Sequence, residues 1–203
     1  IAILILVLIF TRNIHEIAMP GVARGADGYV HMVIAREFRE NGHRVPKDIS
    51  ASVFDWTFSY PYLVHFLLSF LPERYYESVD RVFPTMMDLL YAGILAALIP
   101  LGFITSQEFP LVLALFVTTP QFVQYAGGKG LSARKPGIVL ATLSFLSYVM
   151  WSTGGTRWAL FASVVLAGLT HLTSRFGTQA IVFFYLGFAL LNPVTLLIIP
   201  ASF

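Results

Sequence analysis

The residues best suited to chemistry lie in one short polar stretch, "GADGYVHMVIAREFRENGH" at 25–43. Asp27 stands at the start of a predicted helix, and His31 follows one turn later, so the two share a helix face. A carboxylate and an imidazole on one face could exchange protons with a substrate. The simpler alternatives are that Asp27 only caps the helix and that His31 only packs against its neighbours.

The element that must position these side chains is an amphipathic helix at about 28–41. Asp27 precedes it as a natural N-cap, and Gly42 follows it as a natural C-terminal cap. Its apolar residues fall on one stripe, at Val30, Val33, Ile34 and Phe38. Its charged residues form the polar side, which could equally be an ordinary solvated face with ion pairs: Arg36, Glu37, Arg39 and Glu40.

The rest of the chain is strongly apolar. Of its 203 residues, 57% are hydrophobic and only 12% are charged, whereas a soluble domain normally carries about 25% charged residues. The composition therefore predicts an all-α, polytopic transmembrane helix bundle with about seven membrane helices. Besides the opening run at 1–10, they are expected at about 54–72, 84–106, 109–126, 136–152, 156–174 and 178–203.

The polar connections set the expected topology. Loop 127–136, "GGKGLSARKP", carries three basic residues, including Lys135, and no acid. The positive-inside rule then places this loop in the cytoplasm and the long loop 11–53 outside the membrane. An amphipathic helix in such an external loop should lie in the interface plane, with its apolar face toward the lipid.

Charge and composition also exclude some classes of function. The net charge of +2 is too small to indicate a nucleic-acid partner, and the absence of cysteine excludes disulfides, thiolate metal sites and cysteine nucleophiles. Both ends of the sequence lie in apolar runs. We therefore expect residues 1–203 to form a single transmembrane domain that is a fragment of a longer chain.

Taken in order, these features resemble the N-terminal half of a GT-C type polytopic membrane glycosyltransferase. In that superfamily a first span leads to an external loop with an acidic residue, an interfacial helix, and a Tyr-Pro or Pro-Pro dipeptide before the second span. Here the acid is Asp27 and the dipeptide is Tyr60-Pro61. Two weaker similarities follow, in "GLSARKPG" and "LTHLTSRFGTQA".

The resemblance implies transfer of a sugar from a polyprenyl-phosphate lipid to an acceptor on the outer face, with Asp27 as general base. It also implies an integral multi-pass protein of a prokaryotic plasma membrane, with no nucleic-acid partner. The leaving phosphate needs cations, and an arginine fork suits it better than an ammonium group does. The candidate substrate-binding or phosphate-binding residues are His31, Arg36, Arg39, His43, Arg44, Tyr60 and His65, with Lys47 nearby and Arg44 favoured. No metal ligand is assigned, and a divalent cation is an open alternative.

Three further polar positions lie within predicted spans. His65 is an intramembrane candidate for function, although a structural hydrogen bond explains it equally well. Asp88 is expected to cap its helix or to pair with Arg81. The residues His171, Arg175 and Gln179 follow one another at four-residue spacing and are expected to share one face of a helix or helical hairpin, in a structural or headgroup-binding role.

Two other classes of function remain open. One is a non-catalytic accessory subunit of a larger membrane complex, in which Asp27 would act only as a cap. The other is a transporter, which is disfavoured because the spans carry few charges and show no internal repeat.

Overall fold

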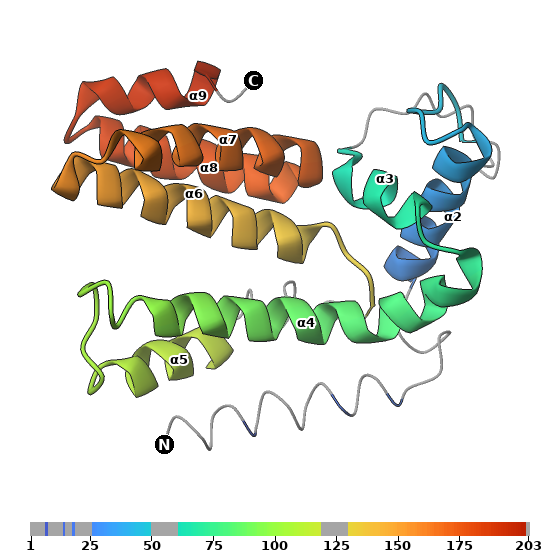
Figure 1. Ribbon diagram of the computed structural model, residues 1–203, viewed down its shortest axis with the longest axis horizontal. Coiled ribbons are helices and arrows are strands. Elements are labelled where there is room, and N and C mark those ends of the chain that lie inside the picture. Colours follow the sequence, from blue (N-terminus) through green and yellow to red (C-terminus); the bar gives the residue numbers. More distant parts are fainter. Residues whose placement is uncertain are drawn as a thin grey trace. The chain divides into compact units, whose positions relative to one another are not determined.

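The computed structural model describes residues 7, 14, 18, 26–49, 61–118 and 130–201 (Figure 1). These residues form eight α-helices and two 3₁₀-helices, and no strand occurs among them, so the all-α class is confirmed for this part of the chain. The chain divides into two compact units: residues 1–36 with 71–135, and residues 37–70 with 136–203. Most of the predicted first span and Tyr60 lie outside the described residues.

Helix α2 spans Ala26–Glu40, which confirms the helix predicted at 28–41. Its buried stripe consists of His31, Ile34, Ala35 and Phe38. Val30, which was predicted to belong to the apolar stripe, is 42% exposed. At about 100° per residue, Val30 lies roughly a quarter turn from the centre of the buried stripe, so it falls at the edge of that face.

The C-terminus of α2 is closed by its backbone. Gly42 adopts a φ of 65°. The Gly42 N–H donates to the Arg39 carbonyl at 3.1 Å, and the His43 N–H donates to the Phe38 carbonyl at 2.7 Å. This pair of bonds is the Schellman arrangement, which satisfies carbonyls that the helix leaves unpaired. The prediction of Gly42 as the cap is therefore confirmed.

Helix α4 spans Tyr76–Ala97 and follows the short 3₁₀-helix η2, Glu73–Tyr75. The span predicted at 84–106 is therefore wrong in its boundaries, since α4 begins at Tyr76 in the charged stretch between two predicted spans. The charges in this stretch favour a helix because Glu77 and Arg81 form an ion pair one turn apart. Pro84 lies inside α4, where the sequence pattern had placed the start of the span.

Helix α5 spans Phe109–Thr118 and packs against α4 through a small apolar core of Ala92, Leu95 and Leu113. A capping box precedes it. The Thr105 N–H donates to the Glu108 carboxylate at 2.7 Å, and the Glu108 N–H donates to the Thr105 hydroxyl at 3.2 Å. This reciprocal pair satisfies two backbone donors at the helix start.

The capping box makes a pH-dependent contribution to stability. The backbone N–H of Thr105, and then its hydroxyl, hold the pKa of Glu108 below the ordinary value of 4.5. Because the folded-state pKa is lowered, this stabilisation is complete above pH 4.5 and is lost as the pH falls through the folded value. We expect Glu108→Gln to lower the thermal unfolding midpoint at pH 7 and to have no effect at low pH. A midpoint difference that stays constant with pH would contradict this.

The second unit contains α3 (Leu63–Ser69) and a group of helices near the C-terminal end (Figure 1). α3 contacts α7, and α8 contacts α7, η4 and α9. The bounds of this group are Arg134–Gly154 (α6), Arg157–Thr173 (α7), Arg175–Ala189 (α8), Pro193–Leu197 (η4) and Ile198–Ala201 (α9). α6 and α7 confirm the helices predicted at 136–152 and 156–174.

The single span predicted at 178–203 is wrong. α8 begins at Arg175 and ends at Ala189, and η4 and α9 follow after a turn. The physical cause is Pro193, which has no N–H to donate and whose ring clashes with the carbonyl four residues earlier. The turn is closed by the Thr195 N–H, which donates to the Asn192 carbonyl at 3.0 Å.

Close packing in this group depends on small residues. A Cβ added to Gly177 would lie 3.0 Å from the Gly137 carbonyl oxygen, and one added to Gly137 would lie 2.4 Å from Ser174 Cβ. α6 and α8 therefore touch almost backbone to backbone, as small residues allow in membrane helices.

Polar side chains of this group face inward. The Tyr185 hydroxyl bonds both the Ser144 hydroxyl, at 2.7 Å, and the Ser163 hydroxyl, at 2.6 Å, and all three residues are buried. Large apolar side chains face outward instead, among them Trp158, Phe161, Phe183, Leu190 and Leu191. In this group of helices, hydrogen-bonded polar side chains thus lie inside and large apolar side chains lie outside.

Within the part of the chain that the structure describes, one helix is long and apolar enough to cross a membrane, namely α6. α7 is apolar but shorter. One such helix is weak support for a multi-pass protein, because a core helix of a soluble protein has the same length and composition.

Candidate functional site

The backbone places Asp27 in the first turn of α2, since the helix begins one residue earlier at Ala26. It therefore does not precede the helix as an N-cap, although a carboxylate in the first turn is still favoured by the helix dipole. Asp27 stands four residues before His31, so its position falls on the same face of α2 as the buried stripe. The side chain of Asp27 lies outside the described part of the structure.

A second carboxylate, Asp80 of α4, lies against this first turn. Asp80 is only 4% exposed, and its Oδ1 accepts the Leu131 N–H at 2.6 Å. A Cβ added to Gly28 would lie 2.0 Å from that oxygen, and one added to Gly130 would lie 2.6 Å away. The backbones of both glycines thus pack directly on the carboxylate. Asp80 lies in the charged stretch between the spans predicted at 54–72 and 84–106, and its role was not predicted from the sequence.

His31 is buried, with 6% of its surface exposed. It lies in the same compact unit as Asp27 and Asp80. The structure thus keeps His31 and Asp27 on one helix within one unit, as the spacing predicted.

Arg36 forms an ion pair with Glu73, with Nε 3.1 Å from Oε2. Both side chains are about half exposed, at 54% and 43%, so the pair adds little to stability. At about 100° per residue, Arg36 lies on the opposite face of α2 from Asp27. This geometry favours a role as an ion-pair partner over binding of a phosphate next to Asp27.

His43 and His65 are both used in packing within the second unit. His43 Nδ1 lies 2.8 Å from the Ser69 hydroxyl, and its ring stacks on Phe70 with centroids 4.2 Å apart. His65 is fully buried and stacks on Phe38 at 6.5 Å. These contacts attach the end of α2 to α3, which is a structural role.

Arg44 and Lys47 line an open groove of about 530 Å³ just after α2. Acidic residues share it, including Glu37, Glu40 and Asp48. The groove carries charges of both signs, so it is not specific for an anion. Arg39 is exposed at the last turn of α2.

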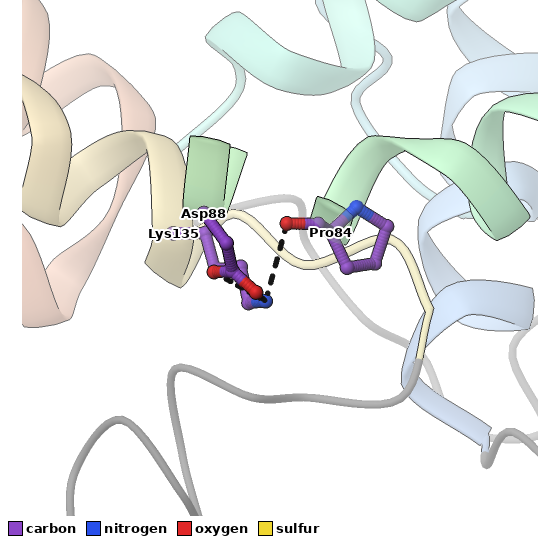
Figure 2. A network of polar contacts seen from close by, with 3 residues as sticks. All are labelled: Pro84, Asp88 and Lys135. Carbon is purple, nitrogen blue, oxygen red and sulfur yellow. Dashed lines mark hydrogen bonds and ion pairs between the residues drawn. The ribbon is translucent and has the colours of Figure 1, made fainter. Parts of the chain in front are cut away.

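A buried ion pair joins α4 to the start of α6 (Figure 2). Lys135 Nζ donates to the two Asp88 carboxylate oxygens at 2.8 and 2.9 Å, and to the Pro84 carbonyl at 3.3 Å. Lys135 and Asp88 are only 4% and 5% exposed. The prediction that Asp88 caps its helix or pairs with Arg81 is therefore wrong. The loop predicted at 127–136 is wrong at its end, because Lys135 belongs to α6.

The single-helix alternative for His171, Arg175 and Gln179 is wrong, because these residues are divided between α7 and α8, which pack against each other. Ser174 has an extended backbone, with φ −155° and ψ 129°, which ends α7 and starts α8. His171 Nδ1 instead lies 3.1 Å from the Thr178 hydroxyl. A hydrogen bond across the turn explains this histidine without a ligand.

Among the described residues, no group of three or more His, Asp or Glu side chains is placed to hold a metal ion. No protein-family model, curated protein or solved structure matches this chain. The functional assignment therefore depends on the residues themselves and on their geometry.

Proposed function

We propose that this chain is part of a membrane glycosyltransferase that moves a sugar from a polyprenyl-phosphate donor to an acceptor on the outer face of the membrane. The observation that carries the proposal is the first turn of α2. Its backbone holds Asp27 and packs, through Gly28, on the buried carboxylate of Asp80. A catalytic carboxylate needs such a fixed backbone, because small displacements of a reacting group cost large factors in rate.

The proposed step is an inverting substitution at the anomeric carbon of the sugar. Asp27 accepts the proton of the acceptor hydroxyl while the acceptor oxygen forms the new glycosidic bond. The bond between the anomeric carbon and the phosphate oxygen breaks, and polyprenyl phosphate leaves with the electron pair. The leaving phosphate must be stabilised by cations.

A lipid-linked donor requires a membrane setting. The outward-facing Trp, Phe and Leu side chains of α7 and α8 support that setting, as does the inward-facing network at Tyr185. A polyprenyl chain would lie along such an apolar face.

A transfer assay tests the proposal. The full protein in lipid vesicles is supplied with radiolabelled short-chain polyprenyl-phosphate hexoses, and released polyprenyl phosphate is measured with sugar, lipid and peptide acceptors. We expect release above the protein-free rate with at least one donor. Donor that stays intact with every acceptor, while the protein is folded, would contradict the proposal.

A second candidate function is a non-catalytic subunit of a membrane complex. The contacts of Arg36, His43 and His65 favour it, since each of these candidate binding residues is used in a structural contact. The effect of removing the Asp27 charge, described in the Discussion, separates the two functions.

A further inference from the structure

Asp80 joins three segments that are far apart in sequence. Its carboxylate is in α4, its hydrogen-bond donor Leu131 lies 51 positions later, and Gly28 lies in the first turn of α2. A Cβ at either glycine would force the Asp80 carboxylate to move, because real Cβ atoms do not approach other atoms to 2.0 or 2.6 Å. Gly130 also has a φ of 97°, which strongly favours glycine.

The electrostatics of this junction are favourable. The first N–H groups of a helix have no carbonyl partner within the helix, and they form the positive end of its dipole. Asp80 places a carboxylate against this end of α2, next to Gly28. A negative charge at that point stabilises the first turn as an N-cap does, but it comes from a different helix.

A second contact holds the same segment to α4. Asp80, Pro84 and Asp88 recur every four residues and so lie on one face of α4. Asp80 binds the backbone of Leu131, and Asp88 binds the side chain of Lys135. The segment 131–135 is thus attached to α4 at two points, by Asp80 and by Asp88. Gly28 of α2 packs against Asp80.

We propose that Asp80 is a positioning residue. It fixes the first turn of α2 against α4 and the segment 131–135, and thereby sets the place of Asp27. The catalytic consequence rests on the proposed function, whereas the anchoring of the turn does not.

Hydrogen exchange at residues 30–33, whose N–H groups bond the carbonyls of the first turn, tests the anchoring in the full protein in lipid nanodiscs. We expect Asp80→Ala to speed exchange there about tenfold or more, because it removes a hydrogen bond to a charged acceptor. Asp80→Asn should stay within about fivefold of wild type, since its amide oxygen can still accept the Leu131 N–H and only the charge at the dipole is lost. Unchanged exchange in Asp80→Ala would overturn the proposal.

Gly28→Ala gives an independent test of the same contact. Alanine normally stabilises a helix relative to glycine, but here its Cβ would collide with Asp80, so we expect faster exchange. In Gly28→Ala/Asp80→Ala the collision is removed, and the effect should be smaller than the product of the two single effects. The matched control is Gly93→Ala in α4, where an added Cβ meets nothing within 4 Å. Equal effects of Gly28→Ala and Gly93→Ala would overturn the proposal.

The transfer assay on the same variants separates the anchoring of the first turn of α2 from its effect on catalysis. We expect kcat of Asp80→Ala to fall at least tenfold with KM nearly unchanged, and Asp80→Asn to restore most of it, as displacement of a catalytic group requires. Faster exchange with an unchanged kcat would overturn the positioning role. Absence of transfer in the wild-type protein would instead contradict the proposed function, and the exchange results would still decide whether Asp80 anchors α2.

Discussion

Asp27→Asn is expected to reduce kcat for sugar transfer by a factor of about 10² to 10⁴, the usual contribution of a general base. The amide keeps the size of the carboxylate but cannot accept the acceptor's proton at neutral pH. KM for the lipid donor should change little, because the lost interaction acts mainly in the transition state. Steady-state transfer in vesicles, with initial rates over a range of donor concentrations, measures both constants.

Stability must be measured beside activity for Asp27→Asn. The loss of a negative charge from the first turn of α2 should cost no more than about 1 kcal/mol, so the unfolding midpoint should be nearly unchanged. The control is Glu77→Gln, which removes an exposed acid on α4 that forms an ion pair with Arg81 and should leave transfer unchanged. If Asp27→Asn transfers sugar at the wild-type rate, Asp27 is not the base, and the non-catalytic function gains support.

Lys135→Met is expected to destabilise the protein by about 3–5 kcal/mol. The substitution leaves the Asp88 carboxylate buried without the two bonds that it receives from Lys135 Nζ. Desolvation of a charge that lacks its counter-ion is strongly unfavourable. Chemical denaturation of the purified protein in detergent, followed by tryptophan fluorescence, measures the change.

Two variants show whether this effect belongs to the buried pair. Lys135→Met/Asp88→Leu removes both charges and should regain most of the lost stability, because an apolar pair can replace a buried ion pair at little cost. Arg81→Ala breaks the exposed pair with Glu77 on the same helix and should cost less than about 0.5 kcal/mol. A double variant as unstable as Lys135→Met would show that the loss comes from packing and not from an uncompensated charge.

Local patterns in the sequence identified much of the secondary structure correctly. The helix around Asp27, its end at Gly42, and helices α6 and α7 were all predicted, because amphipathic spacing, chain length and capping preferences act over a few neighbouring residues. Polarity is a poor sign of a helix boundary in this chain, and the predicted start of the span at 84–106 is wrong for that reason. The stretch at 73–83 is charged, yet most of it is helical, since ion pairs one turn apart favour a helix.

The partners of the buried charges could not be predicted in the same way. Asp88 pairs with Lys135, 47 positions away, although Arg81 is nearer in sequence. The recurrence of Asp80, Pro84 and Asp88 on one helix face was visible as a pattern, but the spacing does not show which segment packs on that face. Only the fold brings Leu131 and Lys135 to it.

Composition and helical spacing are enough to show that this chain is largely apolar and helical, and that Asp27 and His31 share one helix face. Those properties follow from composition and from interactions within single helices. Only the folded chain shows that Asp80, and not a residue near Asp27 in sequence, lies against the first turn of α2. Such a contact depends on chain segments that meet only after folding, and its signature is two glycines whose missing side chains make room for one carboxylate.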